Sequence, residues 1–175
     1  MGARLPTGFI YIYGNVFKAT RPDEQTTNPS IFSSTSGELV LNVFIYNNTI
    51  YGLHGSPPSI GYADTGVRGD NPNSTITVRN NLWQANTYPP GFQAVKTQDY
   101  NLLNTGGASF INAGSGDFHL TQPTPAGIAL PSPYNLDPDG NVRGADGTWD
   151  RGAFEYAPGV AANAAPMAPR GLAFR

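Results

Sequence analysis

The chain of 175 residues contains no cysteine. Disulfide bonds, zinc–thiolate centres and cysteine nucleophiles are therefore excluded. Two histidines, His54 and His119, are too few for a histidine-rich metal site. No apolar run approaches the roughly 18 residues of a membrane-spanning helix. The N-terminus has no signal-peptide profile, although a segment cut from a longer secreted chain would look the same.

Charged residues are also scarce. They make up 13% of the chain, which is about half of the usual share. The formal net charge of −2 provides neither the basic patch of a nucleic-acid-binding protein nor attraction to an anionic membrane. We therefore expect neither nucleic acid nor a membrane as a partner. The 21 glycines and 16 prolines indicate many turns and few helices.

What the chain does contain is an internal repeat centred on asparagine. The segments 9–17, 42–50 and 75–83 (FIYIYGNVF, NVFIYNNTI and TITVRNNLW) align without gaps at a step of 33 residues. A looser copy, VKTQDYNLL at 95–103, follows after a step of 20. The aligned asparagines are Asn15, Asn48, Asn81 and Asn101. Repetition of this kind is typical of a solenoid.

Within each copy, β-branched residues occur at every second position, which predicts a strand with one face toward a core. The two inward columns are Ile10, Val43 and Ile76, and Ile12, Ile45 and Val78. The alternation slips by one at Gly14, Asn47 and Asn80, whose residue types tolerate the left-handed conformation. We expect a sharp corner there. After it, the aligned asparagine points inward, as do Phe17, Ile50, Trp83 and Leu103.

An inward asparagine needs a hydrogen-bond partner. A buried amide left unsatisfied costs about 1–3 kcal/mol. Stacked on the same residue one coil away, at about 4.8 Å, it can bond along a ladder. Such a ladder requires parallel strands in register, and an antiparallel sandwich would not produce it. The sequence therefore predicts an all-β, short parallel β-helix.

This pattern resembles the right-handed parallel β-helix of the pectate-lyase-like superfamily. Coils in that superfamily commonly have about 20–25 residues, so the 20-residue step fits directly. The 33-residue steps imply inserted loops, which we place at 18–40 and 51–74. Both segments are polar, rich in proline and glycine, and without periodicity.

A different pattern occupies 110–156. Its characteristic residues are Gly116-Asp117-Phe118-His119-Leu120, Pro125-Ala126, Asp139-Gly140, Arg143, Asp150 and Gly152-Ala153-Phe154-Glu155. This segment resembles a recurrent ending of bacterial extracellular β-helix proteins, the choice-of-anchor Q type. Thr124 stands where that ending usually has serine, and the acidic residue that often follows is missing. The resemblance implies a secreted or cell-surface bacterial protein and a cap that closes the last coil. Arg143, Asp150 and Glu155 would then form a structural charge cluster.

One loop of this segment raises the question of calcium, because Asp137, Asp139 and Asn141 lie at alternate positions. An EF-hand loop needs glycine at its sixth position and glutamate at its twelfth. Val142 and Thr148 occupy those positions here. We therefore favour an Asx-type turn over a calcium site and expect no metal or other cofactor.

The last residues, 157–175, have the alanine- and proline-rich composition of a linker. Their end, APMAPRGLAFR, resembles the first strand of a fibronectin type III domain. We therefore expect one domain at 1–156, followed by a linker to a further domain. The resemblance implies a monomeric module linked to catalytic or accessory domains of a longer secreted protein.

The outward columns of the same strands carry aromatic residues in consecutive copies. One column holds Tyr11, Phe44, Thr77 and Thr97, and the other holds Tyr13, Tyr46, Arg79 and Asp99. Rings stacked on consecutive coils can pack against the faces of sugars. We predict a polysaccharide-binding site formed by Tyr11, Tyr13, Phe44, Tyr46, Arg79 and Asp99, with Tyr51, Tyr88 and Phe92 as secondary contacts. The alternative is that the two inserted loops cover this stripe and make it part of the core.

Three functions stay open. The favoured hypothesis is a non-catalytic carbohydrate-binding module of an enzyme that degrades plant polysaccharide. A β-helical family of such modules binds xylan, which favours xylan as the β-linked glycan. The second is a fragment of a polysaccharide lyase or glycoside hydrolase, with Asp64, Asp70 and Asp99 as the available carboxylates and Lys18, Arg79 and Lys96 as bases. An ion pair between Arg79 and Asp99 explains both without catalysis. The third is a structural spacer or adhesin segment.

Overall fold

A computed structural model describes residues 7–18, 32–34, 40–52, 67–69, 75–84, 95–103 and 110–159. This part of the chain contains strands and one turn of 3-10 helix, η1 (Ala113–Ser115), and no α-helix. No helix in it is long and apolar enough to cross a bilayer. Most of the expected linker at 157–175 lies outside the described residues.

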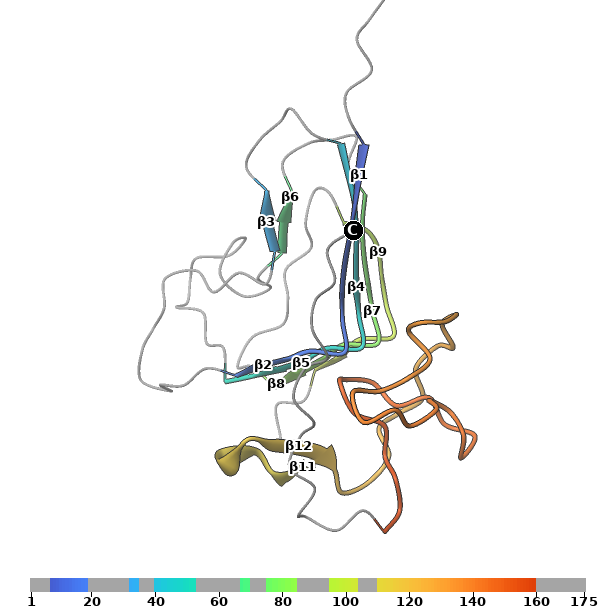
Figure 1. Ribbon diagram of the computed structural model, residues 1–175. Coiled ribbons are helices and arrows are strands. Elements are labelled where there is room, and N and C mark those ends of the chain that lie inside the picture. The colour runs from blue at the N-terminus through green and yellow to red at the C-terminus, as the bar shows by residue number, and fades with distance from the viewer. Residues whose placement is uncertain are drawn as a thin grey trace, which may run out of the picture.

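Two four-stranded sheets, both entirely parallel, account for the repeat (Figure 1). Sheet A has the strand order β1 (Thr7–Tyr13), β4 (Val40–Tyr46), β7 (Thr75–Arg79) and β9 (Val95–Asp99). Sheet B has the order β2 (Val16–Lys18), β5 (Thr49–Tyr51), β8 (Leu82–Gln84) and β10 (Leu102–Leu103). Each strand of sheet A turns at a corner into a strand of sheet B, and we number these units coils 1 to 4.

The register of the coils is the predicted one. Tyr11 pairs with Phe44, Phe44 with Thr77, and Thr77 with Thr97. The register shifts between Ile76 and Thr77, where coil 4 accommodates one additional residue. The expectation of an all-β fold with parallel strands in register is therefore confirmed.

The corners have the left-handed backbone that the slipped alternation predicted. The φ angles are +66° at Gly14, +52° at Asn47 and +55° at Asn80. The corner of coil 4 is Tyr100, with a φ of +52°. Tyrosine has neither the freedom of glycine nor the short polar side chain of asparagine, so this corner is strained.

The asparagine ladder runs through all four coils. The backbone N–H of Asn48 donates to Oδ1 of Asn81 over 3.0 Å, and its Nδ2 donates to the same oxygen over 2.9 Å. Asn15 makes the same pair of bonds to Asn48, and Asn81 makes them to Asn101. The second amide hydrogen bonds to a backbone oxygen, as from Asn48 to the carbonyl of Ile12. Each buried amide is thus satisfied along the stack.

The core lies between the two sheets. Its fully buried members include Val43, Ile45, Ile50, Ile76 and Trp83. The inward columns predicted from the repeat therefore form one hydrophobic cluster, with Ile10, Ile12, Phe17 and Leu103 partly buried against it at the two ends. Trp83 is a core residue, as expected, with an exposed fraction of 2%.

The segments 18–40 and 51–74 are not entirely loops, which corrects the prediction. Lys18, Val40 and Tyr51 belong to the flanking strands. Inside the segments, β3 (Phe32–Ser34) and β6 (Val67–Gly69) form a further parallel pair. Strands of three residues are too short to show an alternating pattern, and the register of the neighbouring coils brings them together.

The C-terminal segment, 110–159, begins with the antiparallel pair β11 (Phe110–Asn112) and β12 (Asp117–Leu120). The expectation was that this segment closes the last coil. Instead it contacts all four coils on their outer side (Figure 1). Lys18 of coil 1 donates to the carbonyl of Ala113, and the N–H of Gly152 donates to the carbonyl of Asn80 in coil 3. Arg151 reaches the carbonyl of Asn101 in coil 4.

The ladder provides a direct test of the fold. Asn81→Leu removes the acceptor of two N–H groups of Asn48 and the Nδ2 donor to Asn101, so we expect it to lower the free energy of unfolding by roughly 3 kcal/mol. Asn15→Leu, at the exposed end of the ladder, is the matched control and should cost about 1 kcal/mol or less. Urea denaturation measures both. Equal losses would contradict the buried ladder.

The strained corner of coil 4 provides a second test. Tyr100→Asn replaces an exposed tyrosine by the residue that coils 2 and 3 use, so we expect a gain of about 0.5–1 kcal/mol in the free energy of unfolding. Tyr100→Ala removes the ring without relieving the backbone and should give no gain. Thermal unfolding followed by circular dichroism compares the two variants. A similar rise in Tm for both would show that the ring, not the corner, causes the strain.

Candidate functional site

The most exposed aromatic residues of sheet A gather on strand β1. Phe9, Tyr11 and Tyr13 have exposed fractions of 62%, 49% and 39%. They occupy alternate positions and therefore share one face of the strand, with about 7 Å between neighbours. The ring of Tyr11 stacks on that of Phe44, with centroids 5.0 Å apart and planes at 11°.

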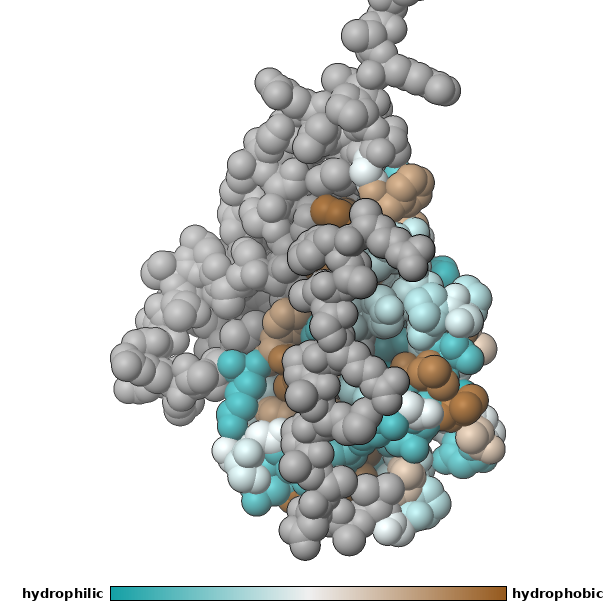
Figure 2. All heavy atoms as spheres, viewed as in Figure 1, coloured by the Kyte–Doolittle hydropathy of each residue, from teal (hydrophilic) through white to brown (hydrophobic). Residues whose placement is uncertain are grey.

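A ring from the C-terminal segment completes this group. Tyr134 lies 4.9 Å edge-on from Tyr13 and 6.0 Å from Tyr11. Its carbonyl accepts a hydrogen bond of 3.0 Å from Nδ2 of Asn47, so the corner of coil 2 positions it. We call Phe9, Tyr11, Tyr13, Phe44 and Tyr134 the aromatic platform. Among the residues coloured in Figure 2, hydrophobic ones form small groups between hydrophilic ones.

Tyr46 is not part of this accessible surface, which corrects the predicted stripe. Only 8% of it is exposed, because it packs against Leu130, Trp149 and the ring of Tyr134. The covering residues thus come from 128–149 of the C-terminal segment. Burial raises the pKa of Tyr46, with an opposing effect of Arg79, and burial raises the pKa of Tyr134 to about 12. Both hydroxyls therefore keep their protons at neutral pH.

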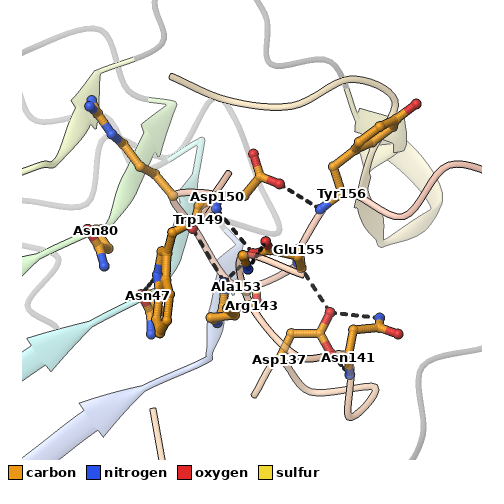
Figure 3. Close-up of polar contacts among 12 residues, drawn as sticks. Asn47, Asn80, Asp137, Asn141, Arg143, Trp149, Asp150, Ala153, Glu155 and Tyr156 are labelled. Carbon is orange, nitrogen blue, oxygen red and sulfur yellow. Dashed lines mark hydrogen bonds and ion pairs between the residues drawn. The ribbon is translucent and has the colours of Figure 1, made fainter. Parts of the chain in front are cut away.

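The corner asparagines anchor this covering segment through outward side chains. The indole N–H of Trp149 donates to Oδ1 of Asn47 over 3.3 Å, and Figure 3 shows the two side by side. Asn80 exchanges two hydrogen bonds with the backbone of Ile128, of 2.7 and 2.9 Å. The backbone approaches so closely that a Cβ on Gly127 would lie 2.7 Å from Oδ1 of Asn80. Trp149 is itself buried.

Arg79 and Asp99 form an ion pair with one another. Nε of Arg79 lies 2.6 Å from Oδ1 of Asp99, and Nη2 lies 3.0 Å from Oδ2. The exposed fractions of the two side chains are 30% and 36%. The ion pair inferred from their shared column is therefore present, and it occupies the polar groups that were predicted to contact a glycan.

Of the secondary candidates, Tyr51 lies apart from the platform. Tyr51 packs against Phe110 and Phe118 beneath sheet B, with ring centroids 6.1 and 5.2 Å away. Tyr88 and Phe92 lie outside the described residues, as does His54. Two platform residues were missed in the sequence. The alternation of β1 could have identified Phe9, whereas nothing in the irregular sequence around Tyr134 indicates its place.

The expected structural charge cluster is present in the C-terminal segment (Figure 3). Arg143 lies 3.6 Å from Glu155 and also donates to the carbonyls of Asp150 and Ala153. Glu155 accepts the backbone N–H groups of Gly144 and Asp150 over 2.6 and 3.1 Å. Burial lowers the pKa of Arg143, although Glu155 opposes this, and burial raises the pKa of Glu155 to about 7. These groups are enclosed by protein and serve the fold.

The calcium candidates form an Asx-type turn. Oδ1 of Asp137 accepts the N–H groups of Asp139 and Asn141 over 3.0 and 2.8 Å. Its Oδ2 accepts the amide of Asn141 and the N–H of Glu155. Within the described residues, no group of three histidine, cysteine or acidic side chains is arranged to hold a metal ion.

His119 lies between two carboxylates. Nδ1 is 2.6 Å from Asp117 and Nε2 is 2.6 Å from Asp139, and the imidazole packs on Phe154 with ring centroids 4.2 Å apart. Burial alone would lower the pKa of His119, but its hydrogen bonds to Asp139 and Asp117 outweigh burial and raise it. Because each ring nitrogen faces a carboxylate oxygen, which accepts, both nitrogens donate, and this imidazolium connects strand β12 to the 134–143 turn.

Comparison with protein-family models, with curated proteins and with solved structures found no match for this chain.

The histidine contact predicts a pH dependence. Because the folded state raises the pKa of His119, its stabilising effect is complete below the unfolded pKa of about 6.5 and is lost as the pH rises through the folded pKa. His119→Gln should therefore cost about 2 kcal/mol at pH 6 and clearly less at pH 9. Urea denaturation at the two pH values measures this. An equal loss at both would mean that the charge contributes nothing.

Proposed function

We propose that this domain is a right-handed parallel β-helix and a non-catalytic carbohydrate-binding module of a secreted bacterial enzyme that degrades plant polysaccharide. The observation that carries the proposal is the aromatic platform. Its three exposed rings, Phe9, Tyr11 and Tyr13, share one face of a strand, and Tyr11 and Tyr13 pack against the rings of Phe44 and Tyr134.

Rings of this kind bind sugars by packing against their C–H faces. Burying about a third of one ring gives on the order of 1–2 kcal/mol before entropy losses. The tyrosine hydroxyls add hydrogen bonds to sugar hydroxyls. Three rings on a pre-formed sheet lose little conformational entropy on binding, so micromolar to millimolar affinity is expected.

The platform favours a neutral, β-linked glycan. None of its five residues is charged, and Arg79, on the same face, is already paired with Asp99. Xylan is the favoured ligand because a β-helical family of carbohydrate-binding modules binds it. Since Tyr46 is covered, we propose that the glycan lies along β1, from Phe9 to Tyr13, and not along the axis of the coils.

The proposal is tested by affinity electrophoresis of the purified protein in gels that contain xylan, β-glucan, pectin or alginate. We expect one neutral β-linked glycan to slow migration. Tyr11→Ala combined with Tyr13→Ala should weaken binding by about tenfold or more, because it removes two ring contacts. Tyr100→Ala, at an exposed tyrosine away from the platform, is the matched control and should bind like the unmodified protein.

Three outcomes would contradict this proposal. Unchanged mobility in every gel would show that the domain binds none of these glycans. Retardation that survives the double substitution would place any glycan site elsewhere. Retardation by pectin or alginate alone would show that the ligand is acidic. Circular dichroism of each variant establishes that lost binding is not lost folding.

A further inference from the structure

One asparagine of the coils, Asn42, has no part in the ladder. In the described part of the four coils, every other asparagine is either a ladder residue or a corner residue. Asn42 instead lies inside strand β4, where asparagine is unfavourable. A residue that departs from the local pattern, and that the fold does not require, marks a candidate functional position.

Asn42 lies at the side of the aromatic platform. It pairs in register with Phe9 on the neighbouring strand, about 4.8 Å away, so both side chains share the outward face of sheet A (Figure 1). Phe9 is 62% exposed and Asn42 is half-buried. The positions of β4 beside Tyr11 and Tyr13 carry aromatic rings instead. Phe9 is thus the platform ring that has a polar group next to it on β4.

Thr75 fixes the orientation of the Asn42 amide. The Oγ1 of Thr75, on strand β7, donates to Oδ1 of Asn42 over 2.7 Å. Since Oδ1 faces β7, the Nδ2 at the other end of the planar amide is directed away from β7, on the side of β1 and solvent. In the part of the chain that the structure describes, this Nδ2 donates to no other residue. An oriented donor beside an exposed ring is therefore available to a ligand.

We propose that Asn42 is a glycan-binding residue whose Nδ2 donates to a hydroxyl oxygen of the sugar packed on Phe9, and that Thr75 positions this amide. The inference rests on the proposed function. It supplies the polar contact that Phe9, unlike the two tyrosines, cannot make itself. A ring recognises the C–H face of a sugar, whereas a directed donor beside it requires an oxygen at one place. Asn42 therefore determines which edge of the sugar faces β4.

The test measures the dissociation constants of xylan and β-glucan by affinity electrophoresis, with each variant compared to its own mobility in a gel without glycan. Asn42→Asp is the decisive variant, because its oxygens still accept the hydroxyl of Thr75 but the Nδ2 donor is gone. We expect it to bind the retarding glycan about threefold to tenfold more weakly, since one hydrogen bond is lost. A purely structural role of the Asn42–Thr75 contact predicts no such loss.

Thr75 is tested with a matched control. Thr75→Val keeps the β-branched shape but removes the hydroxyl that orients the amide, so we expect about threefold weaker binding. Thr77→Val makes the same substitution two residues further along the same face of β7, opposite Phe44, and should bind like the unmodified protein. Circular dichroism of each variant shows whether it is folded.

The outcomes separate this inference from the proposed function. If neither glycan retards the unmodified protein, both are overturned. If Tyr11→Ala combined with Tyr13→Ala loses binding while Asn42→Asp binds as tightly as the unmodified protein, the platform binds the glycan without Asn42 and this inference alone is wrong. Equal affinities of the Thr75→Val and Thr77→Val variants would contradict the positioning role of Thr75.

Discussion

The rest of the structure depends on the asparagine ladder. Asn48 and Asn81 each accept from the preceding coil and donate to the following one, so both amide groups of these buried side chains are satisfied. A slip of one residue between coils would leave several of these groups without partners in the core, at about 1–3 kcal/mol each. The ladder therefore holds the strands parallel and in register. The inward hydrophobic columns and the outward aromatic columns are aligned as a consequence.

The ladder also positions the candidate site, through the residue that precedes it. An asparagine can point inward only because the corner residue before it has a positive φ. At Asn47 and Asn80 that corner residue carries its own amide on the outer side, where it bonds the C-terminal segment. The segment then places Tyr134 beside the rings of β1 and covers Tyr46. The C-terminal segment thus adds Tyr134 to the platform and removes Tyr46 from the accessible surface.

Of the 13 charged residues in the described part of the chain, seven lie in 121–159, which contains no strand or helix. Sheets A and B satisfy their backbone through ladders, but 121–159 has only one isolated β-bridge, between Leu136 and Val142. Its turns are held by side chains that accept several N–H groups at once, such as Asp137, Asp150 and Glu155. Buried carboxylates replace the secondary structure that this segment lacks.

Repetition made much of this fold readable from the sequence alone. Inward columns, corners and ladder residues recur in each copy of the repeat. Every copy has alternating inward and outward residues, then a corner residue with a left-handed backbone, then an asparagine. The outward places of Tyr11, Tyr13 and Phe44 follow from that pattern, and the alternation of β1 extends to Phe9, which was missed. The first two inward columns and Trp83 also follow from it, because period 2 is a property of the strand itself.

Only the tertiary structure decided which of these residues remain accessible. Tyr46 and Trp149 are buried and Tyr134 joins the platform through contacts between residues 87 to 102 positions apart. Each of these contacts occurs only once and involves a segment without periodicity, so no sequence pattern predicts them. The β3–β6 pair is likewise set by the coils that flank it. The sequence by itself determined the repeating coil and its inward and outward faces, because local periodicity specifies them. The exposed surface was decided by long-range packing of a non-repeating segment.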